Sequence, residues 1–329
     1  MKYLLLSLAL LTVGCSSPNV VVVYSPHGKE MLGDYEKKFE EAYPEVDLQW
    51  FDLGAQEVYG KIRNERNRPA ADVWWGAPST MFIQAAEEGL LEPYTPSWAS
   101  AVPAEFKAAD NTWFATFRSP LAILFNTRTM KKEDMPKTWD ALLEPQWQGK
   151  IALRQPLPSG TMRTFLSAMI LRAPDEAAGF AWQKKLHEAT ASYPESPQLL
   201  YDHIKKNADR ISVWLQPDIV MQRDRNGYPF GYAVPEKTPV LTDGIAIVKG
   251  APHPDWAQRF YEFVTSEEAL VQQAHEYAKM PARTDLDADQ LPGWMTEEEV
   301  TPMRLDWDRM GERQDAWMER WENEVYSPK

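Results

Sequence analysis

Three predicted turns from strand to helix carry small hydroxylated residues. These are Ser25, the pair Ser79 and Thr80, and the triplet Ser159-Gly160-Thr161. If a helix begins at such a corner, its first N–H groups are unpaired and carry about half a unit of positive charge. The corner can then hold a phosphate, phosphonate or carboxylate, with the hydroxyls donating beside the amides. Ser and Thr are also preferred helix caps, so for any single corner capping is the simpler interpretation.

Other residues with binding chemistry stand near the ends of predicted strands. Arg118 could pair bidentately with an anionic ligand or form a salt bridge between two parts of the fold, and the sequence leaves both open. Gln216 and Asp218 offer hydrogen-bond partners to ligand hydroxyls or to an ammonium group. Trp74 and Trp75 point to opposite sides of a strand, so we expect one in the core, and Trp75 is the candidate for stacking on a ligand.

The sequence carries no catalytic signature. It has no Gly-x-Ser-x-Gly or His-Glu-x-x-His motif and no zinc-ligand spacing among its five histidines, which are His27, His187, His203, His253 and His275. Its one cysteine, Cys15, allows neither a disulfide framework nor a cysteine metal site. A secreted hydrolase that uses some carboxylate pair remains an alternative, and so does a structural surface lipoprotein.

Strand-like and helix-like segments alternate along the chain. Predicted strands cover 19–24, 46–51, 71–75, 121–126, 150–154, 230–234 and 244–249, with a short helix at 138–143 and helices that begin at Ser159 and Ser196. Leu32, Tyr35 and Phe39 have the spacing of one apolar helix face. This alternation predicts βαβ units and mostly parallel sheets, arranged as two α/β lobes joined by strands.

The first residues are typical of an export signal. Lys2 precedes an apolar run too short to span a membrane, and the run ends at Gly14-Cys15. Residues 11–15 resemble a bacterial lipobox, although Thr12 stands where an aliphatic residue is usual. We therefore expect a signal peptide at 1–14, a lipid on Cys15 and a tether at 15–18, with an ordinary signal peptide as the alternative.

Length and charge limit the remaining possibilities. The chain of 329 residues is long enough for two packed domains. Its formal charge of −13 argues against nucleic acid as a partner, because phosphates would be repelled. The charge does not restrict a small ligand, since a pocket can be locally positive on an acidic protein.

Eight segments together resemble periplasmic binding proteins of the ferric-iron-binding type. They are Val23-Tyr24-Ser25-Pro26-His27, Ala71-Asp72-Val73-Trp74-Trp75-Gly76, Glu88-Gly89-Leu90-Leu91-Glu92-Pro93-Tyr94, Ser159-Gly160-Thr161, Val234-Pro235-Glu236, the run from Asp243 to Ala251, Ser266-Glu267-Glu268-Ala269 and Met280-Pro281-Ala282-Arg283. They occur in the family's order. The resemblance implies a type II periplasmic-binding fold, an α/β fold with two crossover strands and a hinged cleft.

The resemblance also implies roles for residues in that cleft. It favours Ser159-Gly160-Thr161 as a ligand-binding corner and places Glu236 at the cleft. Iron-binding relatives use a His after the first strand, for which His27 is the candidate, but no carboxylate stands near Ala77. The expected tyrosine pair is absent at 213–216, which argues against iron because a hard cation needs anionic oxygen ligands. His27, Tyr228 and Tyr232 form the alternative metal set.

The sequence thus predicts the extracytoplasmic solute-binding component of an ABC importer, with no catalysis and no cofactor. We expect a monomer that binds a small anionic solute by lobe closure, docks on an inner-membrane permease and is held to a membrane lipid through Cys15. The predicted lobes are 19–118 with 243–290, and 119–242, and helices in 291–329 pack on them. The predicted ligand-binding residues are Ser25, His27, Trp75, Ser79, Arg118, Ser159, Gly160, Thr161, Gln216, Asp218, Tyr232 and Glu236.

Overall fold

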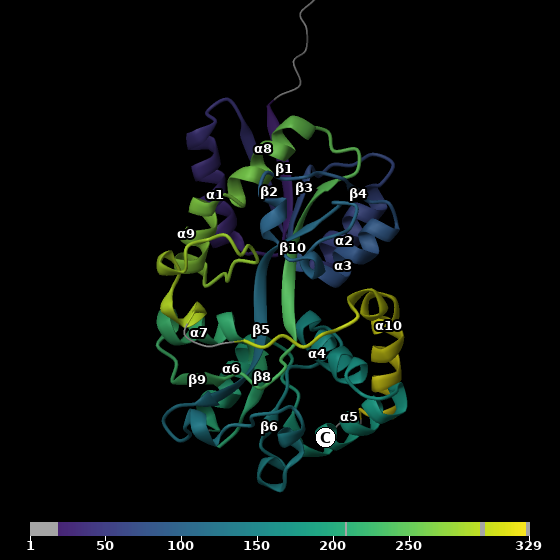
Figure 1. The fold of residues 1–329 in the computed structure, drawn as a ribbon, viewed down its shortest axis with the longest axis vertical. Helices are drawn as coiled ribbons and strands as arrows, with labels where there is room; N and C mark the ends of the chain where they lie inside the picture. The colour runs from purple at the N-terminus through teal and green to yellow at the C-terminus, as the bar shows by residue number, and fades with distance from the viewer. Residues whose placement is uncertain (1–18, 208, 297–299, 327–329) are drawn as a thin grey trace, which may run out of the picture.

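Two α/β lobes are stacked along the long axis of the molecule (Figure 1). The computed structural model describes residues 19–207, 209–296 and 300–326. The predicted signal peptide, Cys15 and the tether lie outside the described residues. No helix in the described part of the chain is long and apolar enough to cross a membrane. The predicted two-lobed α/β architecture is confirmed.

The first lobe is built on one mixed sheet. Its strands are β1 (Val20–Ser25), β2 (Asp47–Asp52), β3 (Val73–Pro78), β4 (Leu91–Glu92), the start of β5 (Phe114–Asn126) and β10 (Val240–Val248). The order runs β2-β1-β3-β10-β5, with β4 beside β10. β1 pairs in parallel with β2 and β3, whereas β10 runs antiparallel to β3 and β5.

Helices cover both faces of this sheet because strand side chains alternate between the faces. On one face lie α1 (Lys29–Ala42), α8 (Pro254–Val264) and α9 (Glu267–Tyr277), and on the other α2 (Ala55–Glu65) and α3 (Ser79–Glu87). Phe39, Phe260 and Ile245 share the core of the first face. Phe82 and Ala246 belong to the core of the second. Neighbouring residues of β10 therefore face opposite sets of helices.

The second lobe has its own sheet and core. β8 (Ser212–Leu215) and β9 (Phe230–Ala233) flank the second half of β5, and β6 (Ile151–Ala152) pairs with β7 (Thr190–Ser192). Around them lie α4 (Gly160–Leu171), α5 (Glu176–Ala189), α6 (Pro197–Lys206) and α7 (Gln216–Asn226). The short 3₁₀ helices of both lobes are η1 (Ala99–Ala101), η2 (Ala104–Phe106), η3 (Lys132–Asp134), η4 (Asp140–Leu143), η5 (Pro145–Trp147), η6 (Ala288–Gln290) and η7 (Gly293–Met295).

Two long strands carry the chain between the lobes. Residues 114–120 of β5 pair with β10, and residues 121–126 pair with β8 and β9. The predicted strands 121–126 and 244–249 cover only parts of β5 and β10, because polar residues such as Arg118 and Thr242 interrupt the apolar pattern there. We call the paired stretch 117–120 with 240–243 the crossover ribbon.

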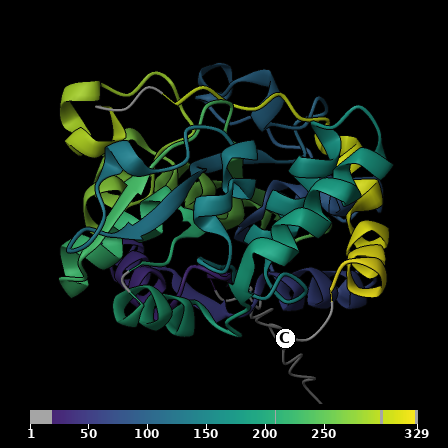
Figure 2. The same ribbon diagram turned by 90° about the horizontal axis from the view of Figure 1, so that it is seen from below.

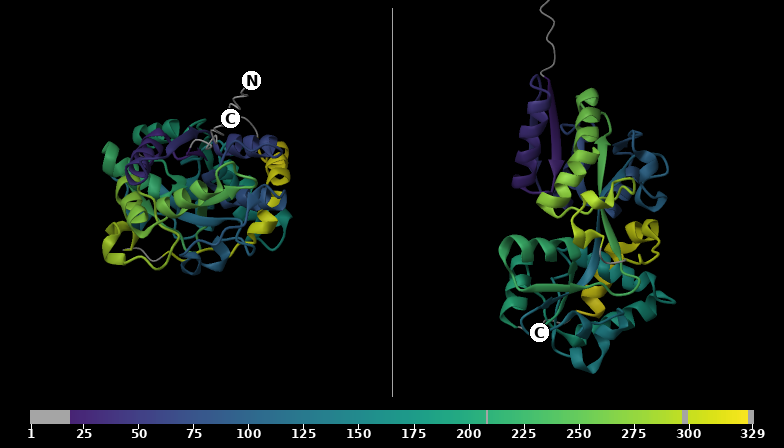
Figure 3. Two further views of the ribbon diagram at one scale, coloured as in Figure 1. Left: turned by 90° about the horizontal axis from the view of Figure 1, so that it is seen from above. Right: turned by 60° about the vertical axis from the view of Figure 1, so that its left-hand side comes forward.

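The C-terminal helix α10 (Trp307–Glu324) touches both lobes. Trp317 and Trp321 are buried in the core of the second lobe, and Gln84 Nε2 of α3 donates a hydrogen bond to Gly311 O at 2.9 Å. Seen from below, α10 runs beside the teal helices of the second lobe (Figure 2). The side view shows it at the level where the lobes meet (Figure 3).

Candidate ligand site at the lobe junction

The crossover ribbon presents different side chains to its two faces. A side chain at Gly244 would collide with Phe82 of α3, since its Cβ would lie 2.7 Å from a ring carbon. The register of β10 is irregular between Asp243 and Gly244, so the faces of the ribbon are set by Phe117, which lies in the core beside α1. Arg118, the next residue of β5, and its cross-strand partner Thr242 therefore point toward α3. Asp243 and its partner Phe117 point to the other face. We call the two sides the α3 face and the α1 face.

Arg118 is the charged residue of the α3 face. Its side chain is half-buried, and its buried Nε has no hydrogen-bond partner. Burial lowers the pKa of the guanidinium, and no acidic neighbour opposes this effect. The group nevertheless stays charged at neutral pH. Within the described ranges Arg118 forms no salt bridge.

Two helix N-termini from different lobes adjoin on the same face. A Cβ on Gly160, the first residue of α4, would lie 3.5 Å from Pro78 Cγ at the start of α3. Ser159 Oγ accepts a hydrogen bond from Met162 N at 3.3 Å, so this hydroxyl caps α4 as the simpler interpretation predicts. Ser79 is buried in the first turn of α3. The first N–H groups of both helices therefore lie close to one another, and Thr161 stands half-exposed beside them.

Gln216 begins α7 from the second lobe. It is only 1% exposed, yet neither its Nε2 nor its Oε1 has a hydrogen-bond partner. The preceding residue, Leu215, pairs with Leu121, the first residue of β5 beyond the ribbon. Leaving a buried amide unpaired costs about 1–3 kcal/mol per group. Gln216 is thus a polar side chain at the junction with unused donors and acceptors.

His27 lies on the α1 face, sealed by aromatic rings. Its ring centroid is 5.0 Å from that of Trp75 and 5.5 Å from that of Phe117, both in edge-on contact. Its Nε2 is buried without a partner, and burial holds its pKa well below the usual value, helped by the charge of Lys279. The imidazole is therefore neutral at pH 7. Ser25 Oγ accepts the backbone N–H of His27 at 3.1 Å, so it shapes this turn.

Three charged groups from separate segments gather on the same face. Lys279 Nζ lies 5.4 Å from the Phe117 centroid, and its charge acts on Asp218 of α7 and on Asp243. Burial raises the pKa of both carboxyls, and the charge of Lys279 partly opposes this rise. The sequence analysis named Asp218 but missed Asp243 and Lys279 as site residues. A charged residue inside an apolar strand was the available signal for Asp243.

The remaining predicted residues lie apart from this group. Trp75 is completely buried in the core of the first lobe, so it supports the His27 ring and exposes no face of its own. Glu236 is exposed, and its backbone N–H bonds Lys137 O. Tyr232 lies on β9, where it pairs with Leu124 of β5. Trp75, Glu236 and Tyr232 therefore do not gather beside Arg118.

The alternative metal set is divided between the lobes. Tyr228 packs against Tyr201 and Phe230 of the second lobe, and Lys132 covers the ring of Tyr232. His27 packs in the first lobe. Among the residues that the structure describes, no group of three or more His, Cys, Asp or Glu side chains could hold a metal ion.

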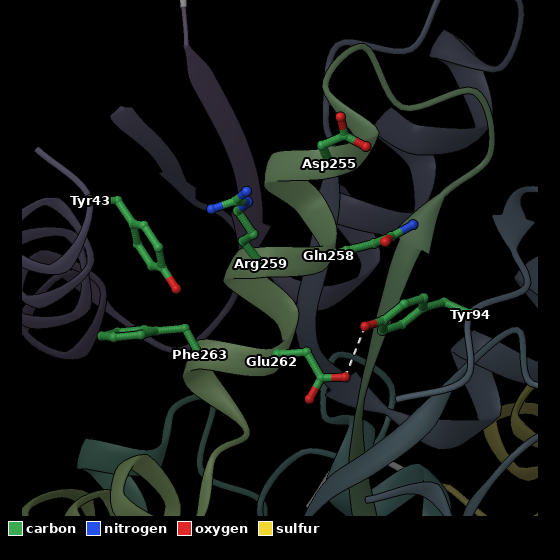
Figure 4. Close-up of a pocket in the computed structure, with 7 residues that line it drawn as sticks. All are labelled: Tyr43, Tyr94, Asp255, Gln258, Arg259, Glu262 and Phe263. Atoms are coloured by element: carbon green, nitrogen blue, oxygen red, sulfur yellow. Dashed lines mark hydrogen bonds between the residues drawn. The ribbon is translucent and has the colours of Figure 1, made fainter. Parts of the chain in front are cut away.

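A separate hollow lies on the outer surface of the first lobe. It encloses about 580 Å³ and is lined by Tyr43, Tyr94, Asp255, Gln258, Arg259, Glu262 and Phe263 (Figure 4). Glu262 is satisfied by Tyr94 and Ser97, and Arg259 is exposed. This hollow therefore lacks the buried, unpaired polar groups that are found at the lobe junction.

Comparison with known proteins identifies the family. Residues 71–313 match the family described as "Bacterial extracellular solute-binding protein", and the chain belongs to it. It is 25% identical over 315 residues to the "Probable ABC transporter periplasmic-binding protein y4fP" of Sinorhizobium fredii, covering 93% of this chain and 87% of that one. It is 24% identical to the "Major ferric iron-binding protein" of Neisseria meningitidis, covering 85% and 86%.

Solved structures agree on the fold. The periplasmic binding protein AfuA of Actinobacillus pleuropneumoniae, with fructose-6-phosphate bound, superposes with a TM-score of 0.77 at 24% identity, covering 93% of this chain and 98% of that one. The resemblance to periplasmic binding proteins and the type II fold that it implied are therefore confirmed.

Proposed function

We propose that this protein is the extracytoplasmic solute-binding component of an ABC importer and captures a small anionic solute between its lobes. One observation carries the proposal: Arg118 is half-buried on the crossover ribbon, its Nε is buried without a hydrogen-bond partner, and no acidic residue pairs with it on the face where α3 and α4 begin. A phosphate, phosphonate or carboxylate group there would neutralise the guanidinium. The functional name of the y4fP relative supports the transport role.

The energetics favour an anion at this position. A charge taken out of water without a counter-ion costs several kcal/mol. Each helix N-terminus adds roughly 0.3–1 kcal/mol for an anion close to it. An Fe³⁺ ion would instead be repelled by Arg118, and the tyrosines of the metal set lie in the second lobe. Iron, the ligand in the name of the Neisseria relative, is therefore the less favoured ligand. The residues at the junction give no reason to propose hydrolysis.

Closure would follow from a ligand that touches both lobes. α3 belongs to the first lobe and α4 to the second, so an anion between them favours the closed arrangement over the open one. We place the lobe boundaries at 118/119 and 242/243 in the crossover ribbon. The closed monomer would dock on a permease, with a lipid on Cys15 holding it on the extracytoplasmic side of a membrane.

A thermal-shift panel with Arg118→Gln tests the proposal. Inorganic phosphate, alkylphosphonates, sugar phosphates, citrate and ferric iron are each added to the full chain. A binding anion at a hundredfold excess over its Kd should add about 2.7 kcal/mol to the free energy of unfolding. Arg118→Gln should weaken that anion about 100-fold, since charge-assisted pairs contribute about 3 kcal/mol.

The matched control is Arg128→Gln, because Arg128 is an exposed arginine of the second lobe. It should leave the affinity unchanged. If no anion in the panel shifts the melting temperature, or if Arg118→Gln binds as tightly as the wild type, the anion site is not where we place it.

A further inference from the structure

A third segment joins the lobes in addition to the two strands of the crossover ribbon. η7 packs beside α9 of the first lobe, and residues 300–306 lead into α10 of the second lobe. On the way, Thr238 N donates a hydrogen bond to Thr301 O at 3.1 Å, and Met303 N donates one to Thr238 O at 2.7 Å. Thr238 lies two residues before β10, so this segment runs along the crossover ribbon. We call residues 300–324 the C-terminal strap.

The strap is anchored in the second lobe along the length of α10. Met310, Trp317 and Trp321 are buried in the core of that lobe. Arg313 also pairs with Glu176 of α5 at 3.4 Å. Pulling large apolar side chains out of a packed core is costly, so the attachment is strong. When the lobes change their separation, α10 therefore moves with the second lobe.

One position of the strap, Gly311, touches the first lobe. A Cβ on Gly311 would lie 3.6 Å from Ile83 Cγ2 and 3.8 Å from Thr80 O of α3. Gln84 Nε2 of the same helix donates its hydrogen bond to Gly311 O. Glycine is disfavoured inside a helix, but here the missing side chain lets α3 pack directly on the backbone of α10. A methyl group fits at these distances, whereas a longer side chain would collide with α3.

This contact lies beside the two helix N-termini of the candidate anion site. Thr80 is in the first turn of α3, and Asp315 of α10 pairs with Arg163, one turn after Gly160 in α4. The strap thus packs across both helices, at the level where the lobes meet (Figure 1). Because α10 stays with α4, a hinge motion that parts the start of α3 from the start of α4 must also part α3 from Gly311.

We propose that the strap is a latch: the contact of Gly311 with α3 stabilises the closed arrangement of the lobes whether or not a solute is bound. A ligand that binds only the closed arrangement has an apparent affinity that is reduced by the fraction of the protein that is open. The latch raises the closed fraction, and so raises the affinity of the anion site without touching the ligand. Its effect on affinity rests on the proposed function, whereas its effect on the lobes does not.

A wedge at Gly311 tests the latch without any ligand. Gly311→Leu adds bulk between α10 and α3, so small-angle scattering of the full chain should show a larger radius of gyration than for the wild type. Gly311→Ala should stay compact, because its methyl group fits. Ala316→Leu is the matched control, since it adds a similar side chain at an exposed position of the same helix. Gln84→Ala removes the hydrogen bond without adding bulk and should open the lobes less than the wedge.

Calorimetry with inorganic phosphate tests the effect on the site. Gly311→Leu should bind phosphate about 5- to 150-fold more weakly than the wild type, the range expected when an overpacked contact disfavours one arrangement. Gln84→Ala should bind it about 2- to 10-fold more weakly, the value of one hydrogen bond. Gly311→Ala and Ala316→Leu should bind it as the wild type does. Circular dichroism checks that each variant is folded.

A covalent lock tests the opposite direction. Ile83→Cys with Gly311→Cys, in a Cys15→Ser background that removes the one natural thiol, places two sulfurs where α3 meets α10. Oxidation should join them, because the two positions are in contact. The oxidised protein should be at least as compact as the reduced protein and should exchange phosphate more slowly, since its lobes cannot part. Reduction should restore the exchange rate of the wild type.

The outcomes separate the latch from the anion site. The latch is wrong if Gly311→Leu keeps the radius of gyration of the wild type, or if the oxidised protein is less compact than the reduced one. If the wild type and Gly311→Leu bind phosphate equally well, the contact does not act on the site, and the inference fails while the proposed function stands. If phosphate does not bind the wild type, the anion site fails with this probe, and scattering alone decides the latch.

Discussion

The two faces of the crossover ribbon carry different charged groups on the same two strands. On the α3 face the chain offers the first backbone N–H groups of two helices and one guanidinium, Arg118. On the α1 face it packs His27 between aromatic rings and places Asp218, Asp243 and Lys279 around them. Because side chains alternate along β5 and β10, adjacent residues serve the two faces. A ribbon of a few residues can therefore separate opposite charges without a large pocket on either side.

The largest expected effect is at Gly76, which packs against His27 on the α1 face. Ala at Gly76 would place a Cβ 2.6 Å from His27 Nε2, and Gly76 has a φ of +95°, which disfavours any side chain. Gly76→Ala should lower the free energy of unfolding by about 2–4 kcal/mol, from overpacking plus backbone strain. Urea denaturation measures the change.

Gly160→Ala is the matched control on the α3 face. Its Cβ would meet Pro78 at 3.5 Å, an ordinary contact, and its φ is unstrained. It should change stability by less than about 1 kcal/mol. Equal losses in the two variants would show that Gly76 is no more tightly packed than Gly160.

A second difference appears in the pH dependence of the ligand-free protein. Burial raises the folded-state pKa of the Asp243 carboxyl above its usual 3.8. The unfolded chain then loses the proton first, so the free energy of unfolding falls as pH rises from about 4 through the raised pKa, and it stays low above that. Asp243→Asn should be more stable than the wild type at pH 7 and equal to it near pH 3.

Comparing Asp243→Asn with the wild type at each pH removes the contribution of His27, which titrates in both proteins. Denaturation across pH 3 to 8 measures the difference curve. A flat curve would mean that Asp243 is well solvated and that the α1 face carries no charge strain.

A smaller effect should follow from Thr161→Val on the α3 face. The Thr161 hydroxyl stands in the first turn of α4, where it can donate to an anion, and the α4 cap is made by Ser159 instead. Valine should therefore weaken anion binding about 3- to 10-fold, the value of one hydrogen bond, and leave the melting temperature of the ligand-free protein nearly unchanged. Calorimetry and thermal melts distinguish this from a folding defect, which would lower both.

The smallest effect is expected at the rim of the α1 face. Arg225 of α7 pairs with Glu30 of α1 at 3.2 Å, which joins the two lobes. Both side chains are exposed, and exposed pairs contribute about 0–1 kcal/mol. Arg225→Gln should weaken ligand binding less than about fivefold, and less still at 1 M salt, where charges are screened. A larger loss would mean that closure depends on this pair more than on the ligand.

Much of the fold was predictable because its signals are local. Ser159 and Ser196 cap α4 and α6, where the sequence predicts helix starts. The strands 19–24 and 230–234 differ from β1 and β9 by a single residue at one or both ends. Predictions failed where the pattern is short or mixed. The predicted strand 150–154 contains only the two-residue β6, the predicted helix 138–143 is a 3₁₀ turn, and β8 was not recognised.

The candidate site was less predictable than the fold. Arg118, Gln216 and Asp218 were named from their places at strand ends, and all three lie at the junction. Trp75 was proposed for stacking, but which of two adjacent tryptophans meets solvent depends on the helices over each face, and both are buried. Glu236 has an acid's chemistry, yet its exposed position beside Lys137 is set by the path of the chain after β9.

By itself the sequence determined the alternation of strands and helices, the capped helix starts and the family, because each depends on residues that are close together in the chain. Only the tertiary structure decided that Asp218, Asp243 and Lys279 share one face while Arg118 faces the other. These residues are up to 161 positions apart, and their grouping depends on strand register and on the turn after α9. Pairing of distant segments leaves no local pattern, so the charge separation across the ribbon could be seen only in the folded chain.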